Sequence, residues 1–231
     1  APPGFTITTE VCTIYNKKGR QEATNLIKDD VLKSIKHIES LTGNKFNDPT
    51  NPQLVSVRSG APISMPGMMD TVLNLGINDE VAETLAKKAN NPRWAWDSYR
   101  RFEQMDGDVV LGMKPENKDD IDPFEAIIEE VKAKKGVKFD TELDVEDLKE
   151  LVQLFKQAVL KGTGKEFPTD AYDQLWGAIY AVFDSWNNDR AILYRRMNQI
   201  PEEYGTAVNV QAMVYGNMGD TSATGVAFSR D

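Results

Sequence analysis

The chain of 231 residues contains one cysteine and one histidine, and it lacks a long apolar segment. Its single cysteine, Cys12, excludes a disulfide within the chain. A reducing compartment follows most simply, so we expect the cytoplasm, or an organelle in a eukaryote, and a buried, inert thiol. The longest apolar run, Leu175–Phe183, is about half as long as a segment that crosses a bilayer. The sequence therefore predicts no membrane partner.

An excess of basic residues is also missing. The 27 lysines and arginines are outnumbered by 36 aspartates and glutamates, which gives a net charge of −9. Nucleic acid and anionic membranes both reward a basic face, so neither is an expected partner. An anionic ligand would need a local group of basic side chains. The hydrophobic fraction of 40% is sufficient for an ordinary core in one large domain or two small ones.

The common catalytic and metal-binding motifs are absent as well. His37 lies within an amphipathic segment without a serine, cysteine or acid placed to form a triad, which favours a surface or boundary position. No CxxC, HExxH or GxxxxGK[ST] pattern occurs. The cluster Asp119, Asp120 and Asp122 lacks the glycine and the final glutamate of a calcium loop, and a solvated linker is the better interpretation. No metal ligand is assigned within this sequence.

The patterns that are present predict an α+β protein. A strand-like run at 5–8 precedes a short helix from Thr9, and Val55 and Val57 indicate another strand. Two strands around a glycine-containing turn are expected after Pro201. Helical spacing is found in the segments 21–41, 80–89, 92 onward, 124–135, 144–161, 170–186 and 190–198. We interpret residues 1–118 and 188–231 as an α+β lobe, and 119–187 as an α-helical subdomain inserted into it.

An aromatic and basic mixture follows Asn91-Pro92, in "RWAWDSYRRF". Such side chains can stack on the bases of a single strand. Core packing is favoured by about four to one, because aromatic residues at helical spacing usually face a core. The aromatic residues in question are Trp94, Trp96, Tyr99 and Phe102.

Two features point to a ligand. Arg58 follows a strand and enters a loop of small and flexible residues, and the segment Gly216–Gly225 is rich in glycine, serine and threonine. A guanidinium matches phosphate oxygens, and an unobstructed turn lets backbone N–H groups approach the same anion. Together they suggest a polyphosphate, although an arginine paired with a surface acid and a plain hairpin would give the same pattern.

Four longer stretches carry a resemblance that covers the chain from end to end. They are "LVSVRSGAPISMPGMMDTVLNLGINDEV", "NPRWAWDSYRRF", "FDSWNNDRAILYRRMNQIP" and "GTAVNVQAMVYGNMGDTSATGVAFSR". Their wording closely resembles the N-terminal nucleotide-binding domain of the pyruvate, phosphate dikinase family. The resemblance implies an ATP-grasp fold, in which two α+β lobes clamp ATP and one lobe carries a helical subdomain.

The resemblance also implies roles for single residues. Arg58 matches an arginine that contacts the ATP phosphates and serves catalysis. Gln211, Met213 and Val214 match a strand that borders the adenine, while Thr224 and Gly225 match a glycine-loop pair over the phosphates. For these positions a solvent-facing strand residue, a core methionine and a plain turn are the structural alternatives. Arg101 is either an interdomain residue or a partner in helix-surface pairing, with even weight.

Several family features fall outside the sequence. An ATP-contacting lysine lies upstream of the part matching "PPGFT", and the Mg²⁺ and γ-phosphate ligands lie downstream of "TGVAFSR". The first residues, "APPGFTITTE", lack a start methionine and a signal peptide. We therefore expect a fragment whose magnesium ligands, phosphohistidine domain and pyruvate-binding barrel belong to the rest of a parent enzyme.

The implied parent is a homodimer that converts ATP, phosphate and pyruvate into AMP, pyrophosphate and phosphoenolpyruvate through a carrier histidine. A phosphoenolpyruvate synthase-type domain is the alternative within the enzyme class. A non-catalytic module whose helices bind a protein is the alternative outside it, and an exposed apolar face on residues 144–161 would favour that module.

Overall fold

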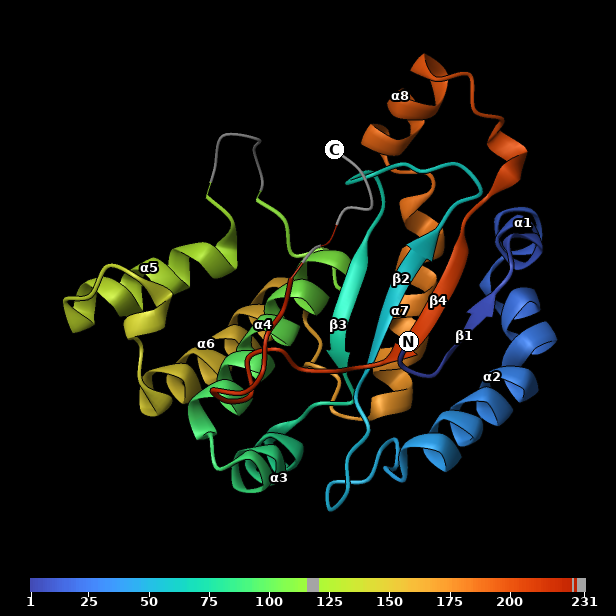
Figure 1. Ribbon diagram of the computed structural model, residues 1–231. Helices are drawn as coiled ribbons and strands as arrows, with labels where there is room; N and C mark the ends of the chain where they lie inside the picture. Colours follow the sequence, from blue (N-terminus) through green and yellow to red (C-terminus); the bar gives the residue numbers. More distant parts are fainter. Residues whose placement is uncertain (116–120, 226, 228–231) are drawn as a thin grey trace.

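The computed structural model describes residues 1–115, 121–225 and 227, and these residues form an antiparallel sheet surrounded by helices (Figure 1). The strands are β1 (Gly4–Ile7), β2 (Val55–Gly60), β3 (Thr71–Leu75) and β4 (Ala207–Ala212). The helices are α1 (Thr9–Lys18), α2 (Arg20–Thr42), α3 (Asp79–Ala89), α4 (Pro92–Val109), α5 (Pro123–Lys135), α6 (Val145–Thr163), α7 (Ala171–Ser185) and α8 (Asp189–Met197). The α+β class predicted from the sequence is confirmed. No helix in the described part of the chain is long and apolar enough to cross a membrane.

The sheet has the strand order β1-β4-β2-β3, and each neighbouring pair is antiparallel. The last strand in sequence, β4, therefore lies between β1 and β2 and joins distant parts of the chain. In the β2–β4 pair, Val57 lies opposite Val210, and both side chains are fully buried. Directly opposed residues of an antiparallel pair share a face, so this register gives the sheet one apolar face.

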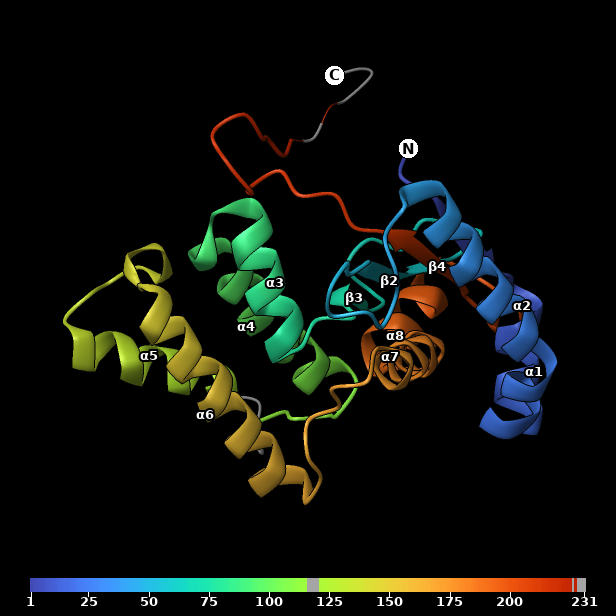
Figure 2. The ribbon, with the colours of Figure 1, turned by 90° about the horizontal axis from the view of Figure 1, so that it is seen from below.

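Helix α7 covers that apolar face (Figures 1 and 2). Its buried residues recur at helical spacing, and each large apolar side chain removed from water contributes about 1.5–3 kcal/mol. They include Leu175, Ala178, Ile179, Val182 and Phe183. Among the described residues, no helix lies across the opposite face of the sheet (Figure 2).

Further helices flank the two edges of the sheet. Helices α1 and α2 lie beside β1 and β4, whereas α4 lies beside β3 and packs against α3 and α6. The four aromatic residues of α4 named above are at most 5% exposed. Their prediction as core residues is confirmed.

Helix starts follow local capping chemistry. Asn78 accepts a hydrogen bond from Val81 N–H, and Asn91 accepts one from Trp94 N–H before Pro92 occupies the first turn. Both helix starts agree with the sequence prediction. The same side-chain capping occurs at Asp122, Asp144, Asp170 and Asn188.

Strands β2 and β3 both differ from the prediction. Arg58 is the fourth residue of β2 and not part of the following loop, because β4 continues to pair with β2 as far as Gly60. Strand β3 was not anticipated; its short sequence, TVLNL, includes Asn74 at a positive φ.

Of the two strands expected after Pro201, the first is present as β4, and the second runs into residues 226 and 228–231, which lie outside the described part of the chain. Strand β4 ends at Ala212, and residues 213–225 and 227 contain no strand. The chain turns instead toward α4, where Tyr215 packs edge-on against Trp94 with ring centroids 4.7 Å apart. Trp94 Nε1 also donates to Asn217 Oδ1 at 3.0 Å. Residues 215–217 therefore contact α4 through side chains and not through the backbone hydrogen bonds of a β-sheet.

The predicted helical subdomain, 119–187, begins outside the described residues. Helix α5 packs on α6, and α6 packs on α4, whereas α7 packs on the sheet. Whether 119–187 folds as a separate unit stays a prediction.

Candidate functional site

The face of the sheet opposite α7 carries polar side chains at neighbouring positions of three strands. Arg58 lies opposite Asn209 in the β2–β4 pair, and Thr6 lies opposite Asn209 in the β1–β4 pair. Ser56 lies opposite Gln211 two residues away. These residues share one face by their register. We call this surface the open face.

Arg58 is the exposed cation of the open face. In the described part of the chain it forms no hydrogen bond or ion pair, and its other register neighbour is Thr71 on β3. The pairing of Arg58 with a surface acid, which the sequence left possible, is not seen among the described residues.

Asn209 supplies a second donor next to Arg58. Its Oδ1 accepts a hydrogen bond from Thr6 Oγ1 at 2.7 Å, and this contact orients the amide so that Nδ2 faces β2. A Cβ at Gly60 would lie 2.5 Å from that Nδ2, so a glycine is needed there to leave the amide in place. A guanidinium and an amide N–H₂ side by side form a set of donors suited to anionic oxygens.

The three residues predicted to border a base lie along β4 and its exit. Gln211 is half-buried and donates from Nε2 to Pro2 O at 3.0 Å. Met213 is half-buried, and its backbone N–H donates to Leu54 O at 2.9 Å, which extends the alignment of this segment with β2. Val214 is 71% exposed. The structure therefore brings Arg58, Gln211 and Met213 to one side of the sheet.

A cavity of about 260 Å³ lies at the Met213 end of the open face. Most of its lining is apolar, and Gln53 and Lys88 supply polar groups. Tyr215, whose burial raises the pKa of its phenol, also lines it and stays protonated at neutral pH. The apolar lining residues include Leu54, Leu85, Trp94, Met213 and Met218.

Thr224 and Gly225 are exposed. A Cβ at Gly216 would meet Thr224 Oγ1 at 1.9 Å, so the segment 216–224 folds back on itself. Its base is held by Asn91 Nδ2, which donates to Met218 O at 3.0 Å. Among the described residues, no hydrogen bond or ion pair joins Thr224 or Gly225 to Arg58.

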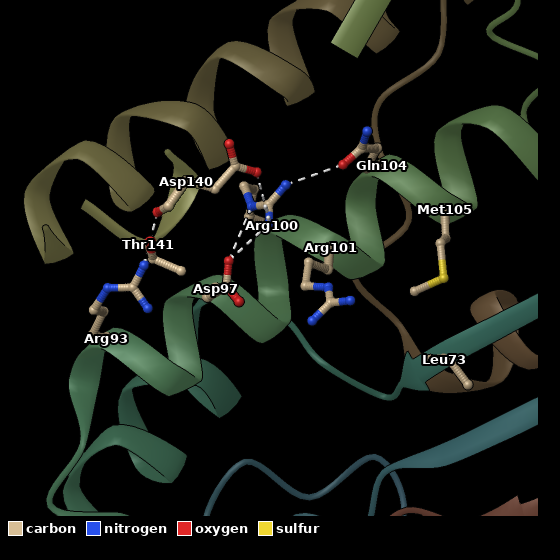
Figure 3. A pocket seen from close by; sticks show the side chains of 9 residues that line it. All are labelled: Leu73, Arg93, Asp97, Arg100, Arg101, Gln104, Met105, Asp140 and Thr141. Atoms are coloured by element: carbon tan, nitrogen blue, oxygen red, sulfur yellow. Dashed lines mark hydrogen bonds and ion pairs between the residues drawn. The ribbon is translucent and has the colours of Figure 1, made fainter. Parts of the chain in front are cut away.

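A larger cavity, of about 470 Å³, lies between α4 and the 3₁₀ turn Asp140–Glu142, with Leu73 of β3 at its border (Figure 3). Arg93 donates to the carbonyl oxygens of Leu143 and Asp140, and Arg100 pairs with Asp97 at 2.9 Å. Arg101 is exposed and points away from that network (Figure 3). Helix-surface pairing of Arg101 is not seen among the described residues.

Among the remaining polar candidates, Cys12 and Asp122 have structural roles. Cys12 is fully buried, and burial raises the pKa of its thiol, as the prediction of an inert thiol requires. His37 lies exposed on α2. Asp122 caps α5, whereas Asp119 and Asp120 lie outside the described residues. Within the described ranges, no group of three or more His, Cys, Asp or Glu side chains is arranged to hold a metal ion.

Sequence reasoning missed Thr6, Gly60 and Asn209. A signal was available, because the alternation in "TAVNVQA" places Asn209 and Gln211 on one face of a strand. Their meeting with Arg58 and Thr6 depends on the pairing of β4 between β1 and β2, which no local pattern reveals.

Comparison with known proteins identifies the family. Residues 1–231 match the family described as "Pyruvate phosphate dikinase, AMP/ATP-binding domain", and the chain belongs to that family. Pyruvate, phosphate dikinase of Clostridium symbiosum is 56% identical over 232 aligned positions, which cover 100% of this chain and 26% of that protein.

Two further relatives show the same coverage pattern. The chloroplastic pyruvate, phosphate dikinase 1 of Arabidopsis thaliana is 53% identical over all of this chain and 23% of its own length. The dikinase of Giardia intestinalis is 49% identical over 99% of this chain and 25% of its own length. The chain thus spans about a quarter of the length of these relatives.

Proposed function

We propose that the open face binds an adenine nucleotide, as one lobe of an ATP-grasp clamp in a pyruvate, phosphate dikinase. The family description names AMP and ATP as ligands of the domain. The observation that carries the proposal is the guanidinium of Arg58 beside the amide of Asn209 on a face that no described helix covers.

The phosphates lie at the Arg58 end in this proposal. Charge-assisted hydrogen bonds from a guanidinium to phosphate oxygens are roughly twice as strong as neutral ones, and they strengthen as charge develops during phosphoryl transfer. Arg58 is the catalytic residue of the lobe, and Asn209 adds a neutral donor. Thr6 acts through Asn209, because it fixes the orientation of the amide.

The adenine lies at the other end, toward the cavity lined by Met213. Leu54, which directly precedes β2, and Arg58 of β2 are four residues apart, a span of about 13 Å at the rise of a strand, which suits an extended nucleoside triphosphate. Met213 packs on the base, and the backbone of Gln211 and Val214 meets its edge. Thr224 and Gly225 reach the phosphates only after the segment 216–225 closes over the bound nucleotide.

The rest of the parent enzyme supplies the remaining chemistry in this proposal. The open face carries no carboxylate beside Arg58 and Asn209 among the described strand residues, so it does not fit a magnesium site by itself. Mg²⁺ is held by residues outside the chain, and its charge neutralises the phosphates when it is bound. The whole enzyme converts ATP, phosphate and pyruvate into AMP, pyrophosphate and phosphoenolpyruvate as a homodimer in the cytoplasm or an organelle.

Arg101 is proposed as an interdomain residue. It is exposed at the border of the 470 Å³ cavity, while Arg93 and Arg100 are engaged with Asp97 and Asp140. An acidic or phosphorylated group on a docking domain, such as the phosphohistidine domain, would meet an exposed guanidinium there.

The protein-binding alternative gains no support from α6. The residues that would form its apolar face are fully buried, and Leu160 is an exception at 48% exposed. The buried residues are Leu148, Leu151, Val152, Phe155 and Val159. A phosphoenolpyruvate synthase-type parent differs in the downstream domains.

The test is a comparison of ATP, AMP and adenosine binding to this chain by ligand-observed NMR. Affinity should rise with the number of phosphates. Asn209→Asp, which replaces the donor by a negative charge, should weaken ATP more than adenosine. Arg196→Ala, which removes an exposed arginine from α8 away from the sheet, is the control. Equal effects of Asn209→Asp on ATP and adenosine would overturn the phosphate assignment.

A further inference from the structure

The loop of residues 61–70 connects β2 to β3 and adjoins α8 (Figure 1). Pro62, Ser64, Pro66 and Gly67 are exposed, and none of the loop belongs to a helix or strand. Met65 is buried, and Ala61, Met68 and Met69 pack half-buried against the same core. A loop of this composition has many accessible backbone conformations, so additional contacts must fix its position.

Three side chains at the junction between α7 and α8 hold the last residues of this loop. Ser185 Oγ accepts a hydrogen bond from Asp70 N–H at 3.3 Å. Asn188 Nδ2 and Arg190 Nε both donate to Met68 O, each at 3.2 Å. The guanidinium of Arg190 also forms an ion pair with the carboxylate of Asp70. We call Ser185, Asn188 and Arg190 the loop tether.

The loop tether is itself fixed to the core. Ser185 Oγ donates to Val182 O at 2.7 Å, and Asn188 Oδ1 caps α8 by accepting from Ala191 N–H at 2.8 Å. Between them, Trp186 is 1% exposed, and the guanidinium of Arg195 lies 4.1 Å from the centre of its ring. The turn that presents the tether therefore has little freedom to move.

The tether acts next to Arg58. Thr71, which follows Asp70 directly, is the β3 residue opposite Arg58. We propose that the loop tether positions the loop 61–70 at the phosphate end of the open face, with Arg190 and Asn188 as positioning residues for nucleotide binding. This inference rests on the proposed function. It adds polar side chains at the junction of α7 and α8, outside the sheet, to the residues that determine nucleotide binding.

Two variants break the tether and leave the helix caps intact. Asn188→Asp keeps the oxygen that caps α8 but places an acceptor against Met68 O, and Arg190→Gln removes the ion pair with Asp70. Asn187→Asp is the matched control, because Asn187 is exposed and its amide contacts Asn16. Arg190→Lys keeps the positive charge beside Asp70 and should retain part of the wild-type order of the loop.

Two measurements separate the tether from the function. Backbone ¹⁵N order parameters of the nucleotide-free chain should be about 0.85 at Met68–Asp70 and fall below about 0.6 in Asn188→Asp and Arg190→Gln, with helices α4 and α7 unchanged. In ligand-observed NMR, the same variants should weaken ATP about tenfold, which corresponds to about 1.4 kcal/mol, and leave adenosine binding unchanged.

Unchanged order parameters in both variants would overturn the tether. A loosened loop with an unchanged ratio of ATP to adenosine affinity would overturn its positioning role. A wild-type chain that does not prefer ATP to adenosine would overturn both the proposed function and the positioning role, and the order parameters would then show whether a purely structural tether remains.

Discussion

At the scale of single residues, the open face depends on a few side chains whose orientation is set by neighbours. Arg58 projects from a strand, Thr6 orients the amide of Asn209, and Gly60 leaves space for it. Each of these residues has a different physical task, so their substitutions should have distinguishable effects on fold and binding.

In a full-length dikinase that carries this domain, Arg58→Ala should slow ATP-dependent turnover. The activation free energy should rise by roughly 2–4 kcal/mol. This is the scale for losing a charge-assisted contact that strengthens in the transition state. Because Arg58 is exposed and contributes no described packing, the fold should survive. Phosphorylation of the carrier histidine by ATP is the measurement, and a normal rate would show that Arg58 is structural.

Gly60→Ala should reduce ATP affinity without unfolding the chain. The added Cβ would come within 2.5 Å of Asn209 Nδ2, which is the end of a flexible side chain and can rotate away. The free energy of unfolding should change by less than about 1 kcal/mol, the usual range for a backbone-compatible glycine substitution. Urea unfolding and an ATP titration check the two parts, and an intact ATP affinity would contradict the role of the amide.

Asp106→Asn should flatten the pH dependence of stability. Asp106 is fully buried on α4, and its carboxylate oxygens have no described hydrogen-bond partner. Burial raises the pKa of Asp106 to about 7 and likewise raises the pKa of Glu103. When the pKa of a carboxyl is raised in the folded state, its contribution to the free energy of unfolding is fully present at pH values below its ordinary pKa, which is near 4.

That stabilisation is lost as the pH rises from about 4 to 7, by up to roughly 1.4 kcal/mol per pH unit. The free energy of unfolding, measured by urea at several pH values, should therefore fall less steeply with pH in the variant. An identical slope in wild type and variant would exclude Asp106 as a titrating group.

At the scale of elements, the helices were the most predictable part of the chain. Their apolar spacing and their Asn and Asp caps are local signals, so α1–α8 appear close to the expected boundaries. Strand β3 is short and lacks such a signal. The end of β2 depends on its partner, because Ser59 and Gly60 become strand residues by pairing with Val208 and Ala207.

The candidate site, too, could be predicted only in part. The resemblance of the sequence singled out Arg58, Gln211 and Met213, which the fold brings to one side of the sheet. The meeting of Asn209 with Thr6 and Arg58, the loop tether and the fold-back of Thr224 on Gly216 could not be predicted, since they depend on contacts between segments more than a hundred residues apart or on side-chain packing.

Limited proteolysis tests the predicted helical subdomain. If 119–187 folds as a unit, the first cuts should fall near residues 118–122 or at 162–165, where α6 ends at Thr163, Gly164 caps it and a polar segment follows. The packing of α7 against the sheet should keep the fragments together under native conditions. Mass spectrometry of early products identifies the sites, and cleavage inside 144–161 before either region would reject the boundary.

At the scale of the whole molecule, the chain spans about a quarter of the length of its relatives. We expect one lobe of an ATP clamp to bind nucleotide weakly and to catalyse no transfer. The proposal places the magnesium ligands and a lysine outside this sequence. Losing several charge-assisted contacts, each worth roughly 1.5–3 kcal/mol, weakens a micromolar site to the millimolar range.

The most direct test of the open face is a titration of the ¹⁵N-labelled chain with Mg²⁺-ATP, followed by amide chemical shifts. We expect saturation in the millimolar range, with shifts concentrated at Ser56–Gly60 and Asn209–Met213 and absent from the core-facing side of α7. Arg58→Ala should abolish the shifts at the phosphate end and keep those near Met213. Shifts concentrated elsewhere on the molecule, micromolar saturation, or a pattern unchanged in Arg58→Ala would contradict it.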